Sequence, residues 1–165
     1  MDNYEKWWMN FDMNNTGCLF ENLSSYFFDK YNVYPNIEAF IDYYSNSELR
    51  KQIDMHHPRF SVLSGKEIIE LIINYDFDKM IPEEFISTSR VDEYCEYKKN
   101  ELYWIGWFIT YCKYKKDTSF SYIYNYIGFS ELRRLYITYH EMDNSVCYNK
   151  IFANEYSTTR TVPVV

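Results

Sequence analysis

The chain has 165 residues, of which 21% are aromatic and 25% charged, and its formal net charge is −7. This length suits one domain with a sizeable core, and the acidic balance disfavours a general nucleic-acid binder. The four cysteines are far apart and form no CxxC pair, so we expect them to be unpaired. With no leader pattern of a charged then an apolar segment, we expect a reduced, cytoplasmic protein.

Charge is unevenly distributed along the chain. Residues 1–97 hold 8 Lys/Arg against 18 Asp/Glu, a net of −10, whereas residues 98–140 hold 7 against 3, a net of +4. An acidic half attracts a basic protein partner or repels nucleic acid.

In chain order, residues 1–16 mix aromatic residues with Asn and Asp and are expected to form either an arm that docks onto the domain or a partner-binding tail. Apolar spacings of three and four, together with capping residues, then predict a series of helices. Their expected ranges are 18–31, 37–45, 47–53, 64–73, a short turn after Pro82, 119–127, 131–140 and 145–152. The caps expected at four of these starts are Ser47, Ser64, Ser130 and either Asp143 or Asn144.

The clearest element is the aromatic-rich run over about 91–116, which is predicted to be the central core helix. Its apolar part is about ten residues long, too short to span a bilayer. Gly106 in its interior is expected to admit a closely packed helix or ring. The residues expected to form the core of this helix are Leu102, Trp104, Ile105, Gly106 and Trp107.

The predicted fold is therefore all-α: a compact single-domain helical bundle around this central helix. The domain is expected to cover residues 1–152, and 153–165 to form an irregular tail. Only the runs 60–64 and 85–89 have some strand character.

Candidates for catalysis are sparse. The three histidines, His56, His57 and His140, have no cysteines or carboxylates at zinc-ligand spacing around them. The four glycines are scattered and form no phosphate-binding loop. We therefore expect no metal, no cofactor and no enzymatic activity.

Residues 118–140 also have the outline of a helix-turn-helix, with Gly128 as the turn and Arg133 and Arg134 on the second helix. A DNA-binding regulator is an alternative on this basis, although the acidic remainder of the chain opposes it.

A longer pattern covers about residues 100–152. It comprises Glu101-Leu102-Tyr103-Trp104-Ile105-Gly106-Trp107, Ile127, Ser130-Glu131-Leu132-Arg133, Leu135-Tyr136, Tyr139-His140 and Asp143. This pattern resembles a group of small bacterial proteins with the form YWIGY…ELR.LY..YH.LD, which are often encoded beside an ADP-ribosyltransferase-like toxin. The chain departs from the group at Phe129-Ser130 and Glu141-Met142.

The resemblance implies an antitoxin-like or accessory protein that neutralises a toxin by contact. The expected partner is a protein, such as an ADP-ribosyltransferase-like toxin, rather than a membrane or nucleic acid. The expected contact residues are Arg133, Arg134, Tyr139 and His140. A phage-type inhibitor that mimics nucleic acid with its acidic surface is the alternative.

Overall fold

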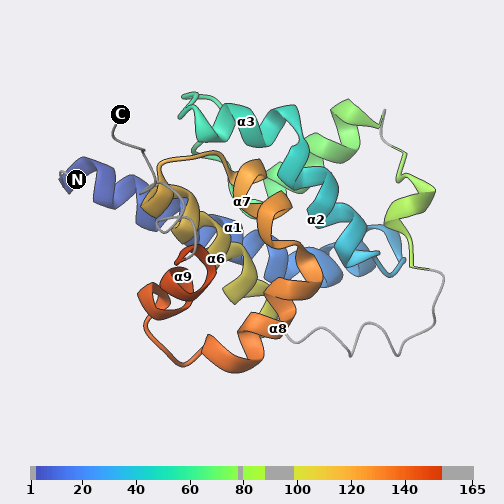
Figure 1. Cartoon of the computed structure of the whole chain (residues 1–165). Helices are drawn as coiled ribbons and strands as arrows, with labels where there is room; N and C mark the ends of the chain where they lie inside the picture. The colour runs from blue at the N-terminus through green and yellow to red at the C-terminus, as the bar shows by residue number, and fades with distance from the viewer. Residues whose placement is uncertain (1–2, 78–79, 88–98, 154–165) are drawn as a thin grey trace, which may run out of the picture.

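The computed structural model describes residues 3–77, 80–87 and 99–153, and within them the chain is helical (Figure 1). The only β-type pairing in these ranges is an isolated bridge between Pro35 and Ile86. The predicted all-α class is confirmed. The helices are α1 (Asn3–Tyr31), α2 (Ile37–Asn46), α3 (Glu48–Asp54), α4 (Gly65–Leu71), the π-helix η1 (Ile72–Asp76), the 3-10 turn η2 (Glu83–Phe85), α6 (Lys99–Lys116), α7 (Phe120–Ile127), α8 (Phe129–Tyr139) and α9 (Asn144–Phe152).

The long helices α1 and α6 pack against each other and cross near the middle of the molecule (Figure 1). Helix α4 packs on α1, and α7, α8 and α9 pack on α6. Leu102, Trp104 and Ile105 of α6 are buried, whereas Trp107 is half-buried and stacks on Tyr111 with the ring centroids 5.8 Å apart.

Two glycines allow α1 and α6 to approach closely. A Cβ on Gly106 of α6 would lie 2.6 Å from the carbonyl oxygen of Thr16 in α1. A Cβ on Gly17 of α1 would lie 2.8 Å from the ring of Tyr103 in α6. Real Cβ atoms do not approach backbone this closely, so the two helices depend on glycine at this crossing.

Several element boundaries differ from the prediction. Residues 3–16, expected as a separate arm, are the first half of the continuous 29-residue α1. Gly17 stays within this helix because it lies in the contact with α6, which offsets its low helix propensity. Residues 91–98 of the expected central helix and the tail from 154 onward lie outside the described residues. In the run 60–64, residues 60–62 form a turn and residues 63–64 are irregular, so this run is not a strand.

The predicted caps are mostly correct. The side chains of Ser47, Ser64 and Asp143 each accept a hydrogen bond from a backbone N–H in the first turn of the helix that follows. Ser130 was wrongly predicted as a cap, because α8 begins at Phe129, two residues earlier than predicted, after Gly128 at φ 81°. That left-handed conformation ends α7 and starts α8 directly.

A buried charge network joins α1, α3 and α6. The guanidinium of Arg50, 1% exposed, donates to the two carboxylate oxygens of Asp12 at 2.8 and 3.1 Å. The ammonium of Lys113 lies 3.1 Å from both Asp12 and Asp54, and Arg50 also donates to Asp54 at 2.7 Å. Two cations and two carboxylates therefore neutralise one another inside the protein, as buried charges require.

Neutral groups complete this network. The hydroxyls of Tyr44 and Thr16 accept hydrogen bonds from Arg50 at 3.0 and 3.1 Å. The other oxygen of Asp54 accepts the backbone N–H of Phe120 at 2.8 Å, at the start of α7. The guanidinium carbon of Arg50 lies 4.3 Å from the centre of the Phe120 ring, a cation–π distance. The network thus also fixes the start of α7.

Substituting Gly106→Ala should destabilise the protein although alanine is the better helix former. The added methyl group would push α1 away from α6, so the free energy of unfolding should fall by about 1–3 kcal/mol. Urea denaturation measures this, and Ile137→Ala, at a site 76% exposed on α8, is the control, with an expected change within about 0.5 kcal/mol. A more stable Gly106→Ala variant would contradict the close crossing.

The charge network should also affect how the stability of the protein changes at acid pH. Burial alone would raise the pKa of Asp12, but Arg50 and Lys113 lower it below its ordinary value. A carboxyl group with a lowered pKa stabilises the fold above its unfolded pKa of about 3.9, and this stability is lost as the pH falls below it.

The Asp12→Asn variant should therefore be less stable at pH 7 by about 3–5 kcal/mol, because it leaves buried cations without their partner. Its stability should also fall less steeply than that of the wild type between about pH 5 and pH 2. Denaturation curves across this pH range measure both effects. Equal slopes for the two proteins would show that Asp12 is not held ionised by the fold.

Candidate functional site

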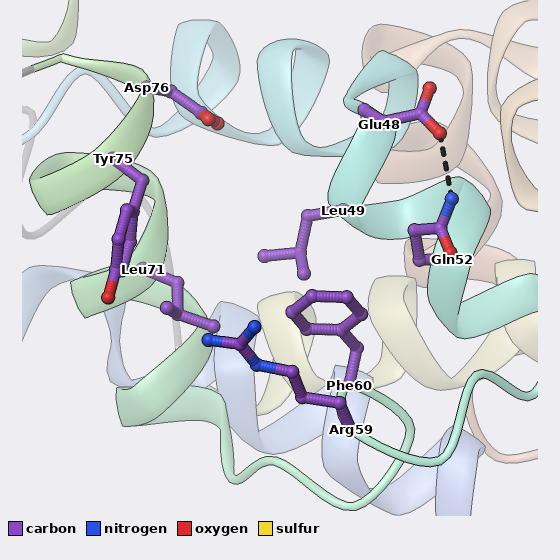
Figure 2. A pocket seen from close by; sticks show the side chains of 8 residues that line it. All are labelled: Glu48, Leu49, Gln52, Arg59, Phe60, Leu71, Tyr75 and Asp76. Carbon is purple, nitrogen blue, oxygen red and sulfur yellow. Dashed lines mark hydrogen bonds between the residues drawn. The ribbon is translucent and has the colours of Figure 1, made fainter.

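A surface groove lies between α3, the loop after α3 and the α4–η1 segment (Figure 2). It consists of two cavities of about 340 and 320 Å³ that share four lining residues. The shared residues are Arg59, Phe60, Leu71 and Tyr75. The first cavity is completed by Glu48, Leu49, Gln52 and Asp76, and the second by Leu63, Glu67, Glu70 and Asn74.

The floor of the groove is apolar. Leu49 and Phe60 face each other in its middle, with Leu71 and Tyr75 opposite (Figure 2). Leu49, Phe60 and Leu63 are half-buried and pack against the main core, so the floor is firmly supported. Tyr75 is 72% exposed and forms a wall that is open to solvent. Such a hollow is suited to receive an apolar side chain.

Four carboxylates surround this floor, held by other side chains. Asp76 accepts a hydrogen bond from the Tyr43 hydroxyl at 2.8 Å, and Glu48 from the Gln52 amide at 2.9 Å. Glu70 pairs with Lys30 at 2.9 Å. The fourth, Glu67, is held by the cap at the start of α4. Each of the four carboxylates therefore has a hydrogen-bond or ion-pair partner within the fold.

The same hydrogen bonds keep the rim negatively charged. The Gln52 and Lys51 side chains lower the pKa of Glu48, and Ser64 lowers that of Glu67. The Lys30 ammonium lowers the pKa of Glu70. These carboxyl groups therefore stay ionised at neutral and mildly acidic pH.

Local sequence explains the α4 wall. Ser64 and Glu67 form the predicted capping box, with the Ser64 N–H donating to Glu67 at 2.7 Å. The apolar run after the cap was predicted as one helix to residue 73, but it changes to the π-helix η1 at Ile72. The wider turn keeps Ile72 and Ile73 buried while Tyr75 lines the groove. Such π-segments often occur at functional sites.

The α3 wall depends on the charge network. Arg50 and Asp54, four residues apart on one face of α3, point inward to Asp12 and Lys113. Leu49 and Gln52 lie on another face of the helix and line the groove. These groove residues were not predicted from the sequence, because Phe60 lies in a loop without periodicity and the other lining residues are up to 16 positions away from it.

The residues predicted as the contact site lie elsewhere, on α8 and just after it. Arg134 and Tyr139 line a separate cavity of about 370 Å³ among α7, α8 and α9. Arg133 instead donates to Glu101 of α6 at 2.8 Å. His140 donates from Nδ1 to the carbonyl oxygen of Tyr136 at 2.7 Å, at the end of the helix. The structure thus brings two of the four residues together in one hollow.

The helix-turn-helix outline corresponds to α7, Gly128 and α8. Each of its two arginines has a carboxylate partner: Glu101 for Arg133 and, at 2.7 Å, Glu131 for Arg134. Phosphate binding by either arginine would have to compete with these pairs.

The described residues contain neither a cluster of metal-binding side chains nor a helix that could span a membrane. Within residues 3–77, 80–87 and 99–153, no three His, Cys, Asp or Glu side chains are grouped to hold a metal ion. Of the cysteines there, Cys112 and Cys147 are buried, and burial raises the pKa of the Cys147 thiol to about 12. None of the described helices has the length and apolar character needed to cross a bilayer.

The two predicted serine caps offer a matched pair of variants. Ser64→Ala should lower the free energy of unfolding by about 1 kcal/mol, because it removes the capping box of α4. Ser130→Ala, on an exposed serine that does not cap α8, should change it by less than about 0.5 kcal/mol. Parallel urea titrations compare the two, and equal effects would contradict the assigned helix starts.

Comparison with known proteins adds no relative: no protein-family model, no curated protein and no solved structure matches this chain.

Proposed function

We propose that this protein acts by binding another protein through the groove between α3 and α4–η1, without catalysing a reaction. The observation that carries the proposal is the apolar floor of Leu49, Phe60 and Leu71 open to solvent beside the exposed Tyr75. Interfaces gain most of their affinity from a few aromatic or apolar anchors in such hollows, and Tyr is among the residue types enriched there.

The charged residues support binding over catalysis. Asp12, Arg50 and Lys113 resemble a catalytic constellation in type, but they are buried in the core and neutralise one another. In the groove, the carboxylates serve as a charged rim around apolar surface, and this division into apolar centre and polar rim is characteristic of protein interfaces.

The partner is proposed from the resemblance over residues 100–152. The group that the chain resembles is often encoded beside an ADP-ribosyltransferase-like toxin. We accordingly propose an antitoxin-like role, in which the groove covers part of such a toxin and blocks it by contact. The resembling segment and the groove lie on different elements, so in this proposal α8 supports the fold and lies outside the contact.

A pair of tyrosine variants tests the proposal. Tyr75→Ala removes an exposed ring from the groove, whereas Tyr122→Ala removes a ring that is 44% exposed on α7, outside it. Both variants should keep the wild-type melting temperature, since neither ring is part of the core. Quantitative co-precipitation from the native cells, with an ADP-ribosyltransferase-like toxin as the expected partner, gives the readout.

Tyr75→Ala should lower partner recovery by at least about tenfold, the loss typical of an interface hot spot. Tyr122→Ala should recover the partner as well as the wild type does. The reverse pattern, or full recovery with both variants, would contradict binding through the groove.

A further inference from the structure

The groove has two similar halves on either side of its shared lining. Each half combines the shared apolar residues Phe60 and Leu71 with one apolar side chain of its own, Leu49 in the first and Leu63 in the second. The α4–η1 wall extends over residues 67–76, about 14 Å at 1.5 Å per residue. That length accommodates two neighbouring side chains from one bound segment.

Each half also carries two carboxylates. Glu48 and Asp76 line the first cavity, and Glu67 and Glu70 line the second, whereas Arg59 is the one cationic side chain that lines both. Four negative groups against one positive group give the groove a net negative lining at neutral pH.

Two of these carboxylates, one in each half, have no cationic partner among the described residues. Glu48 and Glu70 pair with Lys51 and Lys30. Within the part of the chain that the structure describes, Asp76 and Glu67 have hydroxyl and amide donors but no lysine or arginine within 4.0 Å. Each can accept a further charge-assisted hydrogen bond from an incoming cation.

We propose that the groove takes a cationic segment of the partner protein, with two apolar side chains that enter the two halves. Lysine or arginine side chains flanking these anchors pair with Asp76 at one end and Glu67 at the other. This inference rests on the proposed function and specifies the chemistry of the partner. It follows from charge complementarity, since a segment with acidic flanks would be repelled by the same rim.

Designed peptides of about 15 residues test the inference directly, because that length supports a marginal helix. The first has two leucines four residues apart among alanine and lysine. The second has one of those leucines replaced by serine, and the third has glutamate in place of every lysine. Affinity is measured by fluorescence anisotropy at two salt concentrations.

The lysine peptide with two leucines should bind, and loss of one leucine should weaken it by about 10–100-fold, the effect of one buried apolar side chain. The glutamate peptide should show no binding. Equal binding of the lysine and glutamate peptides would overturn the inference.

Paired charge variants of the protein show whether the attraction for the lysine peptide comes from the groove. Glu67→Gln combined with Asp76→Asn should weaken the lysine peptide by about 3–30-fold and reduce its salt dependence, because two charge pairs are lost. Both substitutions keep an oxygen acceptor, which preserves the cap of α4 and the bond from Tyr43. Glu38→Gln combined with Asp42→Asn, at exposed positions on α2, removes the same net charge outside the groove.

The control pair should leave peptide affinity unchanged at the higher salt concentration. Equal weakening by both pairs would overturn the inference, because the attraction would then come from the whole molecule. If no peptide binds while Tyr75→Ala still releases the native partner, the cationic segment is wrong and the groove remains the binding site. If Tyr75→Ala also keeps the partner, the proposed function itself fails.

Discussion

The buried pairing of Arg50 with Asp12 is the interaction on which the other features depend. It joins a seven-residue helix, α3, to the long helix α1, and Lys113 extends the connection to α6. A helix as short as α3 is not stable alone, so its position is set by what it packs against. Because Arg50 and Asp54 turn one face of α3 inward, another face is left to form a wall of the groove. The charge network therefore has a structural role. It positions α3, whose other face forms a wall of the groove, but its own side chains do not line the groove.

This arrangement explains how far the sequence predicted the fold. Local signals gave the helical class and the caps at Ser47 and Ser64, because capping depends on residues three positions apart. They failed where contacts distant in sequence decide the structure. Asp12 was assigned to a docking arm, since its partners Arg50 and Lys113 are 38 and 101 positions away, and these pairings account for an aspartate inside the core. Gly17 was not expected inside a helix, because the aromatic ring that packs on it belongs to α6.

The candidate site was less accessible to prediction for the same reason. The groove combines a half-buried helix residue, a loop phenylalanine and a tyrosine on a π-turn, and no spacing connects Leu49, Phe60 and Tyr75. The resemblance directed attention to α8, where Arg133 and Arg134 are engaged with Glu101 and Glu131. A motif identifies residues that share a sequence context, whereas a binding surface is defined by what the finished fold leaves uncovered. The acidic N-terminal half was expected to attract a basic protein partner or to repel nucleic acid, and the groove rim places four of those carboxylates around apolar surface.

Contact through this groove is the proposed basis of function, and hydrogen–deuterium exchange of the complex with its native partner tests it most directly. Amides of α3 and of residues 65–77 should become protected when the partner binds, while those of α8 should exchange as in the free protein. Protection concentrated in residues 129–140, with the groove unchanged, would contradict the claim and assign binding to the α8 segment instead.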